Sequence, residues 1–166
     1  MNTKVNLAGV ELKNPVMTAS GTFGSGMEYS EFVDLNRLGA VVTKGVANVP
    51  WPGNPTPRIA ETYGGMINAI GLQNPGVAHL CEVDLPWIKE QGVPAIVNVS
   101  GHSIEEYVSV IEALEEDGTA DAYEINISCP NVDAGGLTFG THVPSVTAVV
   151  SACREAAKRP MIVKLS

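Results

Sequence analysis

Basic clusters, long apolar runs and paired cysteines are all missing from this sequence of 166 residues. Ten Lys and Arg residues stand against eighteen Asp and Glu residues, which gives a formal net charge of −8. A nucleic-acid partner requires a basic face for its phosphates, so we expect none. No apolar run is long enough for a signal peptide at the N-terminus or for a span across a bilayer later on. We therefore expect a cytoplasmic protein without a membrane partner.

Cysteine and aromatic residues are also scarce. The three cysteines are too few and too scattered for a disulfide framework or a zinc site, and the three histidines share no ligand spacing with them, so we expect no metal. Aromatic residues make up 5% of the chain, whereas it contains 17 Gly and 11 Pro residues. This composition indicates many tight loops between short apolar segments rather than a helical bundle.

Short apolar runs, rich in Val and Ile, recur along the chain at residues 15–20, 40–45, 95–100, 122–128 and 161–166. Such runs without strict alternation are typical of parallel strands that are buried on both faces. Helical patterns between them predict right-handed crossover connections. The opening segment VNLAGVELK predicts a hairpin before the first strand. The sequence therefore predicts an α/β fold in a single domain, residues 1–166, with about five parallel strands behind an N-terminal hairpin.

Two longer helices are predicted between the later strands. Ser103 and Glu106 form a capping-box pattern that opens the first helix, and Gly118 ends it. The second helix begins near Pro144, since proline suits a first helical turn. Its apolar stripe contains Cys153, which we interpret as a small core residue.

Two shorter helices and one long loop complete the expected pattern. A helix is predicted over residues 28–38, ended by Gly39, and another over residues 77–91, broken or restarted by Pro86. Residues 46–71 carry four prolines and form a long irregular excursion. Loops of this length inside a domain are usually functional.

Polar side chains gather where the predicted strands end. Lys44 and Lys164 come at the ends of apolar runs, and a buried Lys requires an anionic or carbonyl partner, so a functional role is favoured over a solvent-exposed strand end. Asn98 and Asn126 are interpreted as specific hydrogen-bonding groups rather than turn formers, because Asn is unfavourable near a strand end on propensity. In a barrel, or in an open α/β sheet, the active site lies at this edge.

Cys129 lies just beyond the fourth predicted strand and leads into a polar stretch with a Gly pair. A free Cys is most often a buried apolar residue. The ordinary pKa of a thiol is about 8.5, and its thiolate can accept a proton near neutral pH if the surroundings lower that pKa modestly. We therefore favour a reactive Cys129 over a buried apolar one. No dinucleotide fingerprint, P-loop or serine nucleophile elbow accompanies it.

Several segments together resemble the class 1 dihydroorotate dehydrogenases in order and spacing. They are NPVMTASGTFG, VTKGV, GGMINAIGLQNPG, NVSG, EINISCPNV and GGLTFGT. NAIGLQNPG and GGLTFGT are similar to subtype 1B, whose catalytic subunit pairs with an iron–sulfur flavoprotein. The resemblance implies the N-terminal portion of a (β/α)8 TIM barrel, truncated and not closed in this chain, because a whole barrel takes about 250 residues.

The resemblance also implies an activity and a set of site residues. Dihydroorotate would be oxidised to orotate in de novo pyrimidine (UMP) biosynthesis, with Cys129 as the base and FMN as the hydride acceptor. The residues that would contact FMN are Ser20, Gly21, Lys44, Gly45, Asn98, Asn126 and Lys164. The residues that would contact the substrate are Lys44, Asn68, Ala69, Ile70, Gly71, Leu72 and Asn126.

Further partners and two alternatives come with the resemblance. The catalytic subunit would form a homodimer and pass electrons to a partner subunit that carries FAD and a 2Fe–2S cluster and is linked to NAD+. One alternative is pyrimidine reduction, because dihydropyrimidine dehydrogenases share the SCPN segment and an FMN barrel. The other is an inactive half-barrel fragment that lacks the phosphate-binding strands of the barrel.

Overall fold

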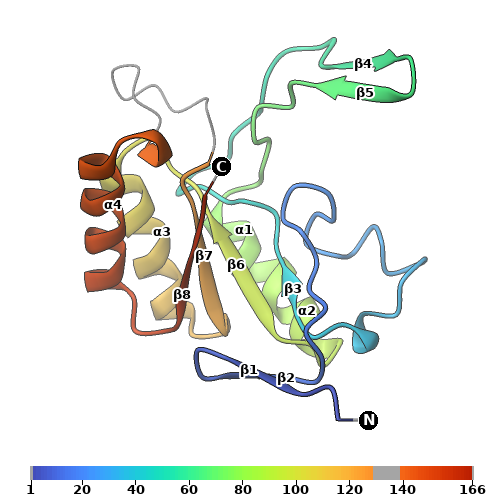
Figure 1. The fold of residues 1–166 in the computed structure, drawn as a ribbon, viewed down its shortest axis with the longest axis vertical. Helices are drawn as coiled ribbons and strands as arrows, with labels where there is room; N and C mark the ends of the chain where they lie inside the picture. The colour runs from blue at the N-terminus through green and yellow to red at the C-terminus, as the bar shows by residue number, and fades with distance from the viewer. Residues whose placement is uncertain (1, 129–138, 166) are drawn as a thin grey trace.

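The computed structural model describes residues 2–128 and 139–165, and its centre is a parallel sheet of four strands (Figure 1). The sheet order is β3 (Val41–Val42), β6 (Ala95–Val99), β7 (Ala122–Asn126) and β8 (Met161–Lys164). Each strand pairs with the next in parallel, and the register places Asn98 beside Glu124. Within the described residues the sheet does not close into a barrel.

Four of the five predicted strands are present, and the first, residues 15–20, is reduced to one parallel bridge between Met17 and Ala40. Thr18 ends the pairing, because its hydroxyl oxygen accepts a hydrogen bond from the Val42 N–H at 2.8 Å. The prediction of a full strand is therefore wrong here. Apolar patterning does not reveal a hydrogen bond between a local side chain and the backbone of a neighbouring strand.

The predicted hairpin is confirmed: β1 (Val5–Leu7) pairs antiparallel with β2 (Val10–Leu12). Ala8 and Gly9 at its turn have φ angles of 51° and 101°. Two consecutive residues with positive φ are typical of the tight turns whose twist matches that of the flanking strands. Leu12 is buried in one cluster with Val42, Ile96 and Ala122 of the central strands, so the hairpin covers the lower end of the sheet (Figure 1).

Helices α3 (Ile104–Asp117) and α4 (Val143–Ala156) pack against each other and cover one face of the sheet (Figure 1). Ser103 caps α3 as predicted, since its hydroxyl oxygen accepts a hydrogen bond from the Glu106 N–H at 3.3 Å. Gly118 ends the helix with a φ of 80°, a left-handed conformation that glycine adopts without steric cost. A short 3-10 helix (Phe139–Thr141) precedes α4.

The main core lies between the sheet and these helices. Tyr123 and Ile125 of β7 are fully buried in it, together with Leu114 of α3. Cys153 of α4 has no exposed surface and belongs to the same cluster, so its interpretation as a core residue is confirmed. Because side chains alternate along a strand, the even-numbered residues of β7 face the opposite side of the sheet.

The helix predicted over residues 77–91 is confirmed and has three consecutive parts. They are α1 (Val77–His79), a π-helical turn (Leu80–Asp84) and α2 (Leu85–Glu90). Pro86 lies in the first turn of α2, directly after the π-helical turn, and the backbone stays helical through Asp84 and Leu85. Of the two predicted effects of Pro86, a break is not seen, and the helix changes from π-helical to α-helical just before this residue.

The helix predicted over residues 28–38 is wrong, because the structure has turns there and only a short 3-10 helix (Leu35–Arg37). Asp34 interrupts the helix with an extended backbone, and its carboxylate accepts a hydrogen bond from the Asn36 N–H at 3.0 Å. Local bonds of this kind offer the backbone an alternative to helical pairing.

Part of the stretch expected to be irregular, residues 46–71, is regular. In it β4 (Ile59–Thr62) and β5 (Gly65–Asn68) form an antiparallel hairpin, which projects on the side opposite to β1 and β2 (Figure 1). Every residue of both strands is exposed. Because neither face of this hairpin is buried, its sequence has no apolar alternation that would reveal the strands.

Candidate active site

The inner face of the sheet, which faces away from the main core, is apolar at one end of the strands and polar at the other. At its lower end it carries apolar side chains, among them Val42, Ile96 and Ala122. At its upper end, where the strands finish, it carries Asn98, Glu124, Asn126 and Lys164. Residues two apart on a strand share a face, so strand register decides that these four polar side chains meet.

Asn98 is fully buried, and both ends of its side-chain amide are hydrogen-bonded. Its Nδ2 donates to Glu124 Oε1, and its Oδ1 accepts from Asn126 Nδ2 at 3.4 Å. Asn126 Oδ1 accepts from the Ser128 hydroxyl at 2.7 Å and from the Ser128 N–H at 3.4 Å. Asn98 therefore makes specific side-chain bonds, whereas Asn126 both makes such bonds and stabilises its own turn.

Lys164 has the anionic partner that its position in the sequence requires. Its Nζ lies 4.0 Å from Glu124 Oε1 and donates to Ser20 Oγ at 3.2 Å. Ser20 Oγ in turn donates to the same Glu124 oxygen at 3.3 Å. Glu124 is not among the predicted site residues. The sequence did contain an indication of its role, since Glu124 is a carboxylate inside a short apolar strand and a buried charge requires partners.

Two predicted site glycines have very different surroundings. A Cβ added at Gly45 would lie 2.5 Å from Asn98 Oδ1 and 2.9 Å from Ser100 Oγ, so this backbone packs directly against the polar side chains. A Cβ added at Gly21 would meet no atom within 4 Å. Packing therefore requires glycine at residue 45, whereas the space beside Gly21 is open to a ligand.

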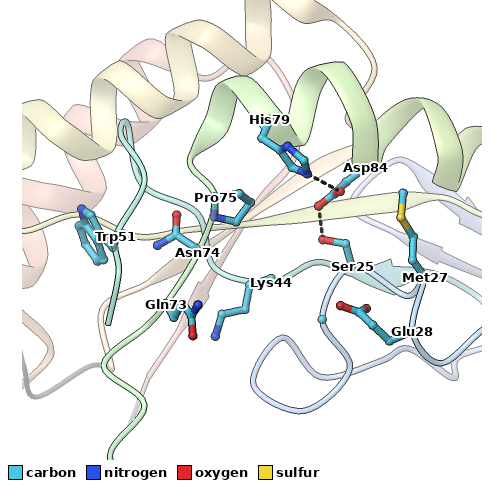
Figure 2. A pocket seen from close by; sticks show the side chains of 11 residues that line it. Ser25, Met27, Glu28, Lys44, Trp51, Gln73, Asn74, Pro75, His79 and Asp84 are labelled. Carbon is cyan, nitrogen blue, oxygen red and sulfur yellow. Dashed lines mark hydrogen bonds and ion pairs between the residues drawn. The ribbon is translucent and has the colours of Figure 1, made fainter. Parts of the chain in front are cut away.

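Lys44, the neighbour of Gly45, lines an open pocket of about 470 Å³ (Figure 2). Gln73 and Asn74 line one side of this pocket, and Glu28 lines the other. The pocket therefore offers a cation, two amides and a carboxylate for binding a polar molecule.

A buried hydrogen bond joins residues 21–26, which contain three glycines, to the helical wall of this pocket. Ser25 Oγ donates to Asp84 Oδ2 at 2.6 Å, and His79 Nε2 lies 3.6 Å from Asp84 Oδ1 (Figure 2). Asp84 lies between the other two residues, so the order differs from that of a nucleophile paired with a histidine base. We interpret Ser25, Asp84 and His79 as a structural contact that holds residues 21–26 against the helix.

The predicted substrate segment, residues 68–72, runs from the end of β5 back toward the sheet. Asn54 holds it in place, because the Asn54 N–H donates to Ile70 O at 3.0 Å and its Nδ2 donates to Ala69 O at 2.8 Å. The Ala69 N–H donates to Arg58 O at 2.8 Å. The segment is therefore ordered by the loop before β4.

Two residues of this segment have left-handed backbones. Gly71 has a φ of 74° and Leu72 a φ of 52°, a conformation that costs energy for a side chain such as leucine. Asn68 and Ile70 line an open hollow together with Gly21. The structure thus brings part of the predicted substrate segment beside a predicted flavin contact.

Cys129, the predicted base, lies outside the described residues, so its role stays a prediction. Burial raises the pKa of the Cys153 thiol to about 11. Burial, aided by the charges of Asp117 and Glu82, raises the pKa of the Cys81 thiol to about 11 as well. Neither of these two thiols is a ready proton acceptor near neutral pH.

The described part of the chain contains no group of three or more His, Cys, Asp or Glu side chains placed to hold a metal ion. None of its helices is long and apolar enough to cross a membrane. Within the described residues, the polar side chains at the upper end of the inner face and the adjoining pockets are the candidates for chemistry.

A parallel α/β sheet whose polar side chains meet at the carboxyl ends of its strands is typical of barrel enzymes, which carry their active sites at that end. The chain belongs to the dihydroorotate dehydrogenase family, whose model matches residues 2–166. The family implies a TIM-barrel fold, and the described residues form an open parallel sheet of four strands with helices.

Curated relatives of the chain share one printed name, dihydroorotate dehydrogenase B (NAD(+)), catalytic subunit. The relatives from Alkaliphilus metalliredigens and Lachnoclostridium phytofermentans are each 61% identical over 166 residues, which cover 100% of this chain and 55% of each relative. The relative from Geobacillus kaustophilus is 52% identical over 163 residues, or 98% of this chain and 52% of that protein. The chain therefore spans about half the length of the curated relatives it matches.

Proposed function

We propose that this chain is part of an FMN-dependent dihydroorotate dehydrogenase that oxidises dihydroorotate to orotate in de novo pyrimidine (UMP) biosynthesis. The observation that carries the proposal is the polar network at the strand ends of a chain that belongs to this family. Its members are Ser20, Asn98, Glu124, Asn126 and Lys164. The relatives carry the dihydroorotate name, which favours this substrate over reduction of uracil or thymine.

The donors and the open space at the strand ends suit a flavin. The half-buried ammonium group of Lys164 offers N–H donors for ring carbonyl and nitrogen acceptors, with the Asn126 amide beside it in the strand register, and the space at Gly21 is open. The residues that would hold FMN are Ser20, Gly21, Lys44, Gly45, Asn98, Asn126 and Lys164. When bound, FMN supplies the hydride acceptor that the oxidation requires. Lys164 would provide a fixed positive charge at the ring edge that becomes negative on reduction.

The substrate would be held by Lys44, Asn126 and residues 68–72. The ammonium group of Lys44 can pair with the carboxylate of dihydroorotate, and charge-assisted hydrogen bonds of this kind are stronger than neutral ones. Asn54 holds the backbone of Ala69 and Ile70 in this segment through two hydrogen bonds. Such preorganisation lowers the entropic cost of binding.

Cys129 would accept the proton that leaves one ring carbon as the hydride leaves its neighbour. It follows Ser128, whose hydroxyl is tied to Asn126, a residue of the polar network. The raised pKa values of Cys81 and Cys153 support this choice among the three cysteines. The protonated thiol would then release its proton to solvent, so that dihydroorotate loses one proton and one hydride in all.

The name of the relatives suggests which partner subunit this protein has. The words "NAD(+)" and "catalytic subunit" indicate that those proteins work with another subunit. We propose that this protein forms a homodimer and passes electrons to an iron–sulfur flavoprotein subunit with FAD and a 2Fe–2S cluster, which delivers them to NAD+.

The test is anaerobic addition of dihydroorotate to the full-length protein loaded with FMN, followed by visible flavin absorbance. We expect bleaching with dihydroorotate. Cys129→Ala should retain FMN but reduce it at least ~10²-fold more slowly, the usual contribution of a positioned base. Cys81→Ala is the matched control and should reduce the flavin at a rate close to that of the unmodified protein. Ordinary reduction in Cys129→Ala would remove Cys129 from this role, and absence of bleaching in the unmodified protein would refute the proposed substrate.

A further inference from the structure

Three groups from separate parts of the chain converge on one oxygen atom of Glu124. Asn98 Nδ2, on β6, donates to Glu124 Oε1. Ser20 Oγ donates to the same oxygen at 3.3 Å, and Lys164 Nζ, on β8, lies 4.0 Å from it. The Glu124 side chain is only 16% exposed, so these groups take the place of water around its charge. A carboxylate with so little solvent is stable only while its partners stay in place.

A series of hydrogen bonds runs from Glu124 through Asn98 and Asn126 to Ser128 along the upper end of the inner face. An ionised carboxylate can only accept, so Asn98 turns its NH2 group toward Glu124 and its Oδ1 toward Asn126. Asn126 then turns its Nδ2 toward Asn98 and its Oδ1 toward the hydroxyl of Ser128. The orientation of each amide is therefore decided by the group before it, beginning at Glu124.

We propose that Glu124 is a positioning residue of the candidate active site. It orients the amides of Asn98 and Asn126 through this chain of hydrogen bonds, and it holds the ammonium group of Lys164 beside Ser20. The inference rests on the proposed function, in which these four neighbours contact FMN or substrate. Glu124 acts through them.

Glu124 also places a negative charge beside Lys164. A flavin gains negative charge on reduction, so a nearby cation raises its midpoint potential and a nearby anion lowers it. The charge of Glu124 therefore counteracts that of Lys164. Removing the Glu124 charge should raise the midpoint potential, and removing the Lys164 charge should lower it. If Glu124 only supported the fold, removing its charge would not raise the potential in the direction opposite to the shift caused by removing the Lys164 charge.

The first measurement is independent of any flavin. In the full-length protein without FMN, NMR follows hydrogen exchange of the side-chain NH2 groups of Asn98 and Asn126. In Glu124→Gln, which keeps the shape but removes the charge, we expect exchange at Asn98 to be about tenfold faster or more, because a hydrogen bond to an ionised group outweighs a neutral one by about that factor. Exchange at Asn126 should rise as well. Glu112→Gln, which removes an exposed carboxylate on α3, is the matched control and should change neither.

The second measurement is the midpoint potential of the FMN-loaded protein. We expect Glu124→Gln to raise the potential and Lys164→Met to lower it, with Glu112→Gln leaving it unchanged. Glu124→Asp keeps the charge but shortens the side chain by one methylene. It should hold the potential close to that of the unmodified protein while exchange at Asn98 rises, and it provides the exchange test if the Gln variant does not fold.

The outcomes separate this inference from the proposed function. Unchanged exchange at Asn98, or a lowered potential, in Glu124→Gln would overturn the positioning role even if dihydroorotate bleaches the flavin normally. Failure of dihydroorotate to reduce the unmodified protein would refute the proposed function, and the exchange measurement would still decide whether Glu124 orients the two amides.

Discussion

Replacing Gly45 with alanine tests the close packing of the candidate active site. The added Cβ would lie 2.5 Å from Asn98 Oδ1 and 2.9 Å from Ser100 Oγ, whereas ordinary van der Waals contacts begin at 3.4 Å. Asn98 is fully buried and its NH2 group is bonded to Glu124. The amide therefore cannot move aside without breaking bonds, and the strain must be taken up by the backbone or by the network.

The expected cost follows from two contributions. Overpacking a well-filled site costs about 1–3 kcal/mol. Displacing Asn98 Oδ1 weakens its bonds with Asn126 Nδ2 and Ser100 Oγ, at 3.4 and 3.5 Å, and each such bond contributes about 1 kcal/mol or less. We therefore expect Gly45→Ala to lower the free energy of unfolding by roughly 2–4 kcal/mol. For a chain of this size that corresponds to a fall in Tm of roughly 5–15 °C.

Gly21→Ala is the matched control. It adds the same methyl group at another predicted site glycine, where no atom lies within 4 Å, so its effect on stability should stay within about 0.5 kcal/mol. Urea unfolding followed by circular dichroism gives the midpoint for both variants and for the unmodified protein. Equal midpoints for the two variants would show that Asn98 and Ser100 do not pack against Gly45, and the network described above would be wrong.

Two further predictions concern the scaffold around the site. Ser103→Ala removes the cap of α3 and should cost about 1 kcal/mol, whereas Ser109→Ala on the exposed side of the same helix should cost almost nothing; equal thermal shifts would contradict the capping role. Glu115 carries a lowered pKa: its burial alone would raise the pKa, but hydrogen bonds from the Lys158 and Arg159 N–H groups and the Arg159 charge outweigh it. Because the folded pKa lies below the ordinary value of 4.5, the contribution of Glu115 to stability is present above that pH and is lost as the pH falls through the folded pKa. The difference in unfolding free energy between the unmodified protein and Glu115→Gln should therefore shrink between about pH 6 and pH 3, and a constant difference would refute the assignment.

Much of the scaffold follows from residues that are close together in the sequence. The Val- and Ile-rich runs predicted the four central strands, and the pair Ala8 and Gly9 marked the first hairpin. Ser103 and Gly118 marked the ends of α3, because a capping side chain and a left-handed glycine act within one helical turn. Where these local signals failed, at residues 15–20 and 28–38, the cause was a single side chain that bonded to the backbone.

The candidate site was only partly predictable. Positions at strand ends indicated Lys164, Asn98 and Asn126, since polar residues directly after buried runs require partners. Glu124 was missed although a carboxylate inside an apolar strand requires partners, because the sequence does not show which side chains the neighbouring strands bring to it. The hairpin β4–β5 was missed for a different reason, since its strands bury no face and carry no alternation.

By itself, the sequence determined which segments become parallel strands and which polar residues lie at their ends, since both depend on local patterns of burial and hydrogen bonding. Only the tertiary structure decided which of those residues meet. Ser20 reaches Glu124 across 104 residues of sequence and Lys164 across 144. The register between parallel strands places Asn98 beside Glu124 and Asn126 beside Lys164 on the inner face, and the packing of the loop that carries Ser20 brings its hydroxyl to them.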